Sequence, residues 1–234
     1  MSAIELFNLK KQYEKSQETP LLVLKGISLS IPKGQFTSLM GPSGSGKSTL
    51  LQIIGALDTP TSGSVSINGT PLESMNDQAL TLFRRRHLGF IFQFFNLLPT
   101  LTAMENVALP ALLDGKKLNE LAPKIKELLA KLGLENRLNH FPHQLSGGEM
   151  QRVAIARSLI NDPLVILADE PTGNLDSKTG KEVLSLFRKL TQEKGVTVVM
   201  VTHDAYAASV GDKILRLNDG RIAQEDSTRE IQLN

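Results

Sequence analysis

A glycine-rich segment at residues 41–48 has the composition and spacing of a phosphate-binding loop. Its sequence, GPSGSGKS, fits the pattern G-x-x-x-x-G-K-[ST]. Glycines let the backbone bend closely around a phosphate, so that successive N–H groups converge on its oxygens at the start of a helix. In this pattern the lysine places its ammonium on the β- and γ-phosphates and the next hydroxyl binds Mg²⁺. The candidate nucleotide-binding residues here are Gly41, Pro42, Ser43, Gly44, Ser45, Gly46, Lys47, Ser48 and Thr49.

Two adjacent carboxylates follow an apolar segment much later in the chain. Residues 164–168 are typical of a buried strand, and Asp169 and Glu170 come directly after it. Ligands of open α/β sheets bind at the carboxyl ends of the strands, so both side chains are expected at the site. Asp169 suits the Mg²⁺ shell, and Glu170 would orient or deprotonate the water that attacks the γ-phosphate. A solvated acidic turn is the alternative, which the phosphate loop disfavours.

A second candidate anion site lies at residues 145–151, which read LSGGEMQ and precede an apolar helix. Ser146 and Glu149 have the spacing of a helix capping box. A capping box does not require the two glycines between them. Gly147 and Gly148 leave the first helical turn without side chains and expose its N–H groups, which favours anion binding. One nucleotide would contact both anion sites if they came from different copies of the chain.

These motifs must be positioned by elements that alternate between strand and helix patterns. Strands are expected at residues 4–9, 26–31, 35–40, 63–68, 88–92, 164–168, 197–201 and 213–217. Helices are expected at residues 77–86, 147–160 and 177–193, with a helical pattern from about 94 to 146. Apolar strands between helices imply a parallel sheet covered on both faces, with an all-helical insert in the middle of the chain.

Composition excludes several classes of protein. The 234 residues include 26 Lys and Arg against 24 Asp and Glu, so no electrostatic binding of nucleic acid is expected. There are no cysteines, which excludes disulfides, thiolate metal sites and a cysteine nucleophile. No apolar run approaches the roughly 18–20 residues that cross a bilayer. Any link to a membrane is therefore expected to depend on a partner.

With these motifs in this order, the chain resembles the ATP-binding cassette (ABC) ATPases. Residues 41–48 resemble their Walker A motif, residues 145–151 their signature motif, and residues 164–170 their Walker B motif with its catalytic glutamate. The resemblance implies an α/β fold of the P-loop NTPase type, with a mainly parallel sheet, an N-terminal antiparallel β-subdomain and an inserted α-helical subdomain. It implies a single domain over residues 1–234, in which residues 1–93 and 161–234 form the RecA-like core with the β-subdomain and about 94–160 form the helical subdomain.

The resemblance implies roles for four further residues. Gln93 would contact Mg²⁺ and water, and His203 would hydrogen-bond the γ-phosphate. Asp176 would lie at a dimer interface, and Tyr13 would stack on adenine. A histidine after a strand is also typical of a surface, and an aromatic near a first strand is typical of a core. The implied catalytic residues are Glu170, His203, Gln93 and Lys47, and the implied Mg²⁺ ligands are Ser48, Gln93 and Asp169.

In this family two chains enclose two ATP molecules head to tail, which explains two anion sites on one chain. The resemblance therefore implies ATP and Mg²⁺ as ligands and a homodimer on ATP binding. ATP closes the dimer and hydrolysis lets it reopen. The residues implied to reach ATP from the partner subunit are Ser146, Gly147, Gly148, Glu149 and Asp176.

Two classes of ABC ATPase remain open. The first is the ATPase subunit of a bacterial transporter with a separate transmembrane permease, which would hold the chain at the cytoplasmic face of the membrane. The second is a soluble ATPase of DNA repair, chromosome structure or translation. A single cassette without a heptad arm or zinc-binding cysteines favours the first. Residues 94–99, FFNLLP, resemble the region that lines the groove for the permease's cytoplasmic helix, although both phenylalanines are also typical of a core.

Within transporters, three phrases resemble the lipoprotein-releasing (LolD-like) and macrolide-exporting (MacB-like) ATPases. They are QIIGALDTPTSG, RRRHLGFIFQFFNLLPTLTAMENVALP and DEPTGNLD. Cell-division cassettes of the FtsE type are close relatives and stay an alternative. This resemblance implies a permease that transmits mechanical motion across the membrane.

Overall fold

Short apolar segments alternate with amphipathic ones, and strands and helices form from them in that order. The computed structural model describes residues 1–14 and 20–228. The strands are β1 (Ser2–Tyr13), β2 (Leu21–Pro32), β3 (Phe36–Met40), β4 (Ser62–Ile67), β5 (Thr70–Pro71), β6 (Leu88–Ile91), β7 (Val165–Asp169), β8 (Thr197–Val201), β9 (Lys213–Asn218) and β10 (Arg221–Ser227). The helices are α1 (Lys47–Ile54), α2 (Asp77–His87), α3 (Ala103–Leu112), α4 (Leu118–Lys131), α5 (Gly147–Leu159), α6 (Ser177–Lys194) and α7 (Ala205–Ser209), with short 3₁₀ turns at Leu72–Ser74 and Pro142–Gln144.

The strands form two sheets. An antiparallel sheet has the order β2-β1-β4-β5, which confirms the expected N-terminal β-subdomain. The second sheet has the order β10-β9-β3-β8-β7-β6. Its strands β9, β3, β8, β7 and β6 are parallel, and β10 adds an antiparallel edge. The prediction of a mainly parallel sheet is therefore confirmed.

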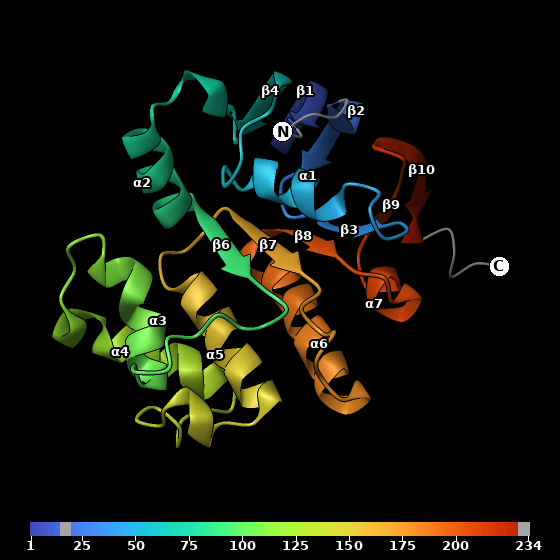
Figure 1. The fold of residues 1–234 in the computed structure, drawn as a ribbon. Coiled ribbons are helices and arrows are strands. Elements are labelled where there is room, and N and C mark those ends of the chain that lie inside the picture. The colour runs from blue at the N-terminus through green and yellow to red at the C-terminus, as the bar shows by residue number, and fades with distance from the viewer. Residues whose placement is uncertain (15–19, 229–234) are drawn as a thin grey trace.

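The mainly parallel sheet separates two hydrophobic clusters. Successive side chains of a strand point to opposite faces, so each buried strand supplies both clusters. In β7, Val165 and Leu167 pack with α1 and the antiparallel sheet, whereas Ile166 and Ala168 pack with α5 and α6. Figure 1 shows the resulting layers, with α1 between the two sheets and α6 on the opposite face of the larger one. None of the helices in the described part of the chain is both long and apolar enough to cross a membrane.

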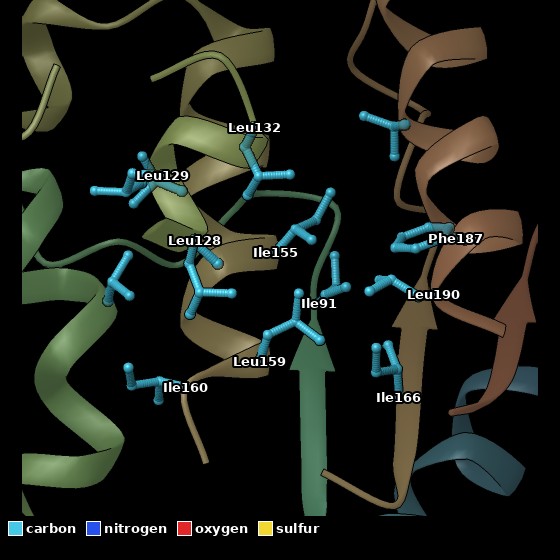
Figure 2. Packing of buried hydrophobic residues seen from close by; sticks show 14 of the residues in the cluster. Ile91, Leu128, Leu129, Leu132, Ile155, Leu159, Ile160, Ile166, Phe187 and Leu190 are labelled. Atoms are coloured by element: carbon cyan, nitrogen blue, oxygen red, sulfur yellow. The ribbon is translucent and has the colours of Figure 1, made fainter. Parts of the chain in front are cut away.

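Among the residues that the structure describes, the buried side chains of the inserted helices belong to the same hydrophobic cluster as one face of the larger sheet. The predicted helical stripe of Ile125, Leu128, Leu129 and Leu132 is buried, and these residues belong to the same cluster as Ile166 of β7. Figure 2 shows α4 side chains packing toward α5, with Phe187 and Leu190 of α6 beside β7 in the same cluster. Subdomain boundaries near residues 94 and 160 stay a prediction, because one cluster extends across them.

Three elements were not predicted from the sequence. Strand β5 has two residues and α7 has five, which is too short for a periodic pattern to appear. Strand β10 is an edge strand whose residues are mostly exposed and polar, so it lacks an apolar alternation. Within the expected helical stretch, α3 begins only at Ala103, after a capping box between Thr102 and Glu105. The segment between the end of β6 at Ile91 and the start of α3 at Ala103 is a loop, although a helical pattern was expected from residue 94.

Candidate active site

The phosphate loop connects β3 to α1 at the carboxyl edge of the larger sheet. Gly41 has a φ of 154°, and a Cβ there would lie 2.0 Å from the carbonyl oxygen of Leu217. Glycine is therefore required at this close approach. The Lys47 Nζ donates hydrogen bonds to the carbonyls of Gly41 and Pro42, each at 2.9 Å. The lysine side chain thus folds back onto the backbone of its own loop.

The C-terminal hairpin supports the phosphate loop from outside. The Gly220 N–H donates to the carbonyl of Ser45 at 3.1 Å, and Leu217 is the residue that contacts Gly41. Lys25 of β2 forms an ion pair with Asp219 in the same hairpin. No role at the nucleotide site is predicted from the sequence for residues 218–220. The contact joins segments about 175 residues apart in the chain, so a local pattern does not reveal it.

Asp169 lies at the end of β7, next to the loop. Burial and the adjacent charge of Glu170 raise the pKa of its carboxyl, while a hydrogen bond from the Ser48 hydroxyl and the charge of Lys47 oppose that shift. A half-buried carboxylate paired with a hydroxyl is the oxygen-rich environment that Mg²⁺ prefers. The residues present therefore fit the cation that the sequence predicts.

Glu170 occupies a backbone conformation that residues other than glycine rarely adopt. Its φ is 46°, and Pro171 follows it, which restricts its conformation further. Such a conformation costs roughly 1–3 kcal/mol and persists only where surrounding contacts fix it. Its N–H donates to the Val201 carbonyl of β8 at 3.0 Å, and the Gly173 N–H donates to its carbonyl at 3.1 Å. With the backbone held in this conformation, the Glu170 side chain contacts His203.

His203 and Glu170 form a direct pair. The Nδ1 of His203 lies 2.9 Å from the Oε1 of Glu170, and this hydrogen bond raises the pKa of the histidine. The histidine side chain is 73% exposed, whereas that of Glu170 is only 17% exposed. His203 is therefore exposed, as is typical of a surface histidine, but it also forms a hydrogen bond with Glu170.

The turn after Glu170 contacts the segment that contains Gln93. The Asn174 Nδ2 donates to the Gln93 carbonyl at 2.9 Å, and Gly173 packs against the Gln93 amide. Asp176 ends this turn as the N-cap of α6, where it accepts hydrogen bonds from the N–H groups of Lys178 and Thr179. Its capping role was not predicted, although an Asp before a helical pattern is a known cap signal.

The start of α5 forms the capping box that its spacing predicted. The Ser146 Oγ accepts from the Glu149 N–H, and the Glu149 carboxylate accepts from the Ser146 N–H at 2.8 Å. Arg137 donates to the same carboxylate at 2.8 Å, and these bonds lower the pKa of Glu149. Its carboxylate is thus engaged within its own chain.

The two glycines of this segment differ in their surroundings. A Cβ on Gly148 would lie 2.5 Å from the Cγ2 of Thr179, so α6 requires the glycine for packing. A Cβ on Gly147 would meet no atom closer than 3.8 Å. No hydrogen bond among the described residues joins Ser146, Gly147 or Gly148 to the phosphate loop. Packing therefore explains Gly148 and leaves Gly147 available for a ligand.

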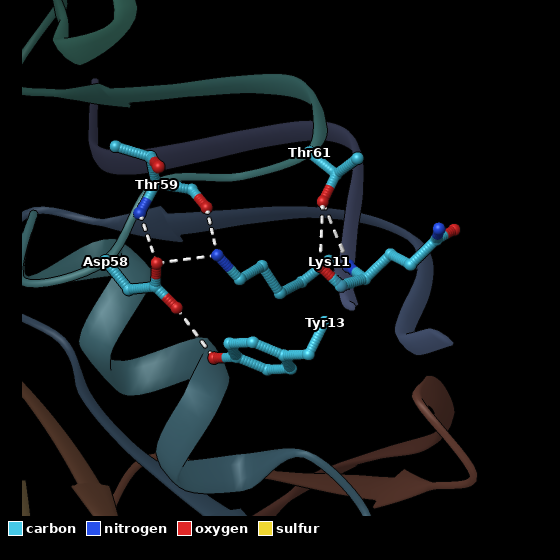
Figure 3. A network of polar contacts seen from close by, with 6 residues as sticks. Lys11, Tyr13, Asp58, Thr59 and Thr61 are labelled. Carbon is cyan, nitrogen blue, oxygen red and sulfur yellow. Dashed lines mark hydrogen bonds and ion pairs between the residues drawn. The ribbon is translucent and has the colours of Figure 1, made fainter. Parts of the chain in front are cut away.

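Tyr13 belongs to a polar network at the base of the phosphate-loop helix. Its hydroxyl donates to Asp58 at 2.6 Å, and Lys11 donates to the other oxygen of Asp58 at 2.6 Å and to the Thr59 carbonyl. Figure 3 shows the Lys11 chain alongside the Tyr13 ring, with its Nζ 4.7 Å from the ring centroid. Tyr13 is 37% exposed, so the core alternative is wrong for this residue. Asp58 fixes the ring by its hydroxyl and leaves part of the ring exposed.

The site therefore combines a phosphate loop, a carboxylate suited to Mg²⁺ and a glutamate–histidine pair. Residues 24–173, more than half of the chain, match the family model described as ABC transporter. The chain belongs to the ABC transporter family. Members of this family hydrolyse ATP, and this chain is accordingly an ABC transporter ATPase.

Relatives and solved structures agree with this family. The macrolide export ATP-binding/permease protein MacB of Rhodopirellula baltica is 49% identical over 95% of this chain, which spans 33% of that longer protein. The lipoprotein-releasing system ATP-binding protein LolD of Geobacter metallireducens is 49% identical over 96% of this chain and 99% of its own length. A dimeric post-hydrolysis structure of the ATP-binding cassette MJ0796 with ADP and Pi matches with a TM-score of 0.86 and 46% identity, covering 97% of this chain and 99% of that one. MJ0796 comes from Methanocaldococcus jannaschii.

Proposed function

We propose that two copies of this chain enclose two ATP molecules and that the closing and reopening of the dimer drives a transmembrane permease. The observation that carries the nucleotide chemistry is the Glu170–His203 pair at the end of β7, beside the phosphate loop. The dimeric MJ0796 cassette supports the same arrangement of two copies. In it, the start of α5 would reach the phosphates bound by the partner subunit.

The residues of one chain divide the work on ATP. Lys47 and the loop N–H groups bind the phosphates, and Ser48, Gln93 and Asp169 would hold Mg²⁺, which neutralises charge on the phosphate oxygens. Glu170 accepts a proton from the attacking water or orients it. His203 holds the Glu170 carboxylate and donates toward the γ-phosphate. Water, carboxylate and phosphate are then aligned by groups whose positions the fold already fixes.

Tyr13 is proposed to stack on the adenine, and its replacement tests that role. Tyr13→Ala is expected to raise the KM for ATP roughly 5- to 150-fold with little change in kcat, since base–aromatic stacking contributes about 1–3 kcal/mol. Tyr13→Phe is the matched control, because it keeps the ring and removes only the hydrogen bond to Asp58. Steady-state ATPase assays measure both constants, and a KM for Tyr13→Ala equal to that of the wild type would contradict the role.

A groove beside Gln93 is proposed to receive a cytoplasmic helix of the permease. It has a volume of about 390 Å³ and lies between α2, β6, α3 and α5, with apolar lining residues that include Leu57, Phe90, Leu109 and Leu113. Phe94 is 74% exposed in the neighbouring loop, so the core alternative is wrong for it. Arg157 of α5 lines the groove and holds the Phe95 carbonyl at 2.7 Å. Motion of a helix seated here would therefore reach the segment that follows Gln93.

If the groove binds the permease, a substitution in it should weaken permease binding without changing the ATPase activity of the isolated chain. Leu113→Ser removes a 62% exposed side chain from the groove and is expected to weaken permease binding roughly 30-fold, as for a central interface residue. The matched control is Phe7→Ser, which removes a 70% exposed side chain from the antiparallel sheet. Co-purification from membranes measures binding, and isolated ATPase activity should be unchanged in both variants. Equal permease recovery from the two variants would argue against the groove.

The type of permease is proposed from the named relatives. The relatives named LolD and MacB agree with the resemblance seen in the sequence. That resemblance implies a permease that transmits mechanical motion. The test uses tagged Glu170→Gln protein, expressed in the native host and purified from detergent-solubilised membranes with ATP and Mg²⁺. Mass spectrometry should identify a polytopic protein with a large extracytoplasmic domain. Recovery of soluble proteins or ribosomes alone would favour the soluble alternative and leave the ATPase chemistry intact.

A further inference from the structure

The turn that carries Glu170 is held by a buried amide from α5. Gln151 is fully buried, and its Nε2 donates to the carbonyl of Pro171 at 2.7 Å. Pro171 directly follows Glu170 and is itself buried. A hydrogen bond in a buried environment is stronger than one exposed to water. The bond therefore fixes the peptide group next to the strained residue.

The strained backbone of Glu170 requires such fixed points. A residue with a φ of 46° relaxes toward a commoner conformation unless its neighbours prevent it. Hydrogen bonds with Val201 and Gly173 hold the N–H and the carbonyl of Glu170 itself. The Gln151 bond holds the next carbonyl and comes from a different element. Rotation of the peptide after Glu170 would break it.

Fold stability gives only a partial reason for an amide at this position, because its N–H satisfies the buried Pro171 carbonyl while its oxygen stays unpaired. Among the described residues, the Oε1 of Gln151 accepts no hydrogen bond, although it is buried. A buried polar atom without a partner is unfavourable, so an apolar side chain of the same length would remove the unpaired oxygen but leave the Pro171 carbonyl without its donor. What the amide alone provides is the N–H that reaches Pro171.

We propose that Gln151 is a positioning residue for Glu170, holding the Pro171 carbonyl so that the carboxylate stays aligned for hydrolysis. This inference rests on the proposed role of Glu170. Gln151 lies on the same helix that begins at Ser146 and Gly147, which are proposed to contact the partner's nucleotide. The bond therefore joins the contact for one nucleotide to the catalytic carboxylate of the other.

The test compares Gln151→Met with Ser158→Ala. Methionine keeps the length of the side chain and removes the donor. Ser158→Ala removes another buried hydrogen bond two turns further along α5, from the Ser158 hydroxyl to the Ile155 carbonyl, and serves as the matched control. Gln151→Met is expected to lower kcat for ATP by about 10- to 100-fold, as for a misaligned catalytic group. Its KM for ATP should stay within about 2-fold of the wild type, because binding of the nucleotide is untouched.

Hydrogen exchange of the nucleotide-free chain provides a second readout. The Gly173 amide, which donates to the Glu170 carbonyl, should exchange faster in Gln151→Met than in Ser158→Ala or the wild type. Gln151→Leu, which also lacks a hydrogen-bond donor, should behave like Gln151→Met. Wild-type kcat and unchanged exchange in Gln151→Met would overturn the inference, as would equal losses in Gln151→Met and Ser158→Ala. If instead Glu170→Gln hydrolysed ATP normally while Gly173 exchanged faster in Gln151→Met, the role of Glu170 would fail and the Gln151 bond would stand.

Discussion

Glu170→Gln is expected to slow ATP hydrolysis by about 10²–10⁴, the effect of removing a general base. The substitution keeps the size of the side chain and an oxygen that faces His203, so the strained turn and the phosphate loop should persist. ATP binding should therefore be retained. Because the proposed dimer would close on ATP and reopen after hydrolysis, the variant should accumulate as an ATP-bound dimer. Phosphate release measures the rate, and light scattering at saturating ATP measures the mass.

The control for this variant is Glu193→Gln, which neutralises an exposed carboxylate near the end of α6. It should hydrolyse ATP at the wild-type rate and return to the monomer as ATP is consumed. A Glu170→Gln protein that stays monomeric at saturating ATP would contradict the proposed dimer.

His203→Ala should also lose activity, since it removes the group that holds the Glu170 carboxylate at 2.9 Å.

Lys47→Met is expected to weaken ATP binding by about 2–5 kcal/mol, or roughly 30-fold or more in affinity. That range is typical of the loss of one partner from a buried charge pair. The physical reason is that no other cation of the loop would remain to neutralise the phosphates, because residues 41–49 contain only this one charged side chain. Isothermal titration with a slowly hydrolysed ATP analogue measures the affinity directly.

The structure adds a second consequence for this variant. Lys47 donates to the carbonyls of Gly41 and Pro42, so its loss also removes two hydrogen bonds that fix the loop in the free protein. Melting temperatures without nucleotide separate a general loss of stability from the loss of phosphate binding. Lys33→Met, which removes an exposed lysine between β2 and β3, is the control. Nucleotide affinity in Lys47→Met equal to that in Lys33→Met would overturn the assignment of the phosphate loop.

Much of the fold and the motif chemistry was predictable from short segments of sequence. The loop at 41–48, the strand that ends in Asp169 and the capping box of Ser146 each depend on residues close together in the chain. Hydrophobic periodicity and residue composition indicate secondary structure within such short segments directly. The edge strand β10 and the five-residue helix α7 escaped prediction because they are polar or too short to show a period.

The sequence by itself determined that this chain binds and hydrolyses a nucleoside triphosphate, since spacing within a few residues specifies that chemistry. Tertiary structure alone decided how the reacting groups are held. It brought Asp58 to the hydroxyl of Tyr13, Gly220 to the phosphate loop and Gln151 to the carbonyl of Pro171. Each of these contacts joins segments between 20 and about 175 residues apart. Such contacts follow from how the two sheets and α5 pack together, and no local pattern of residue types encodes that packing.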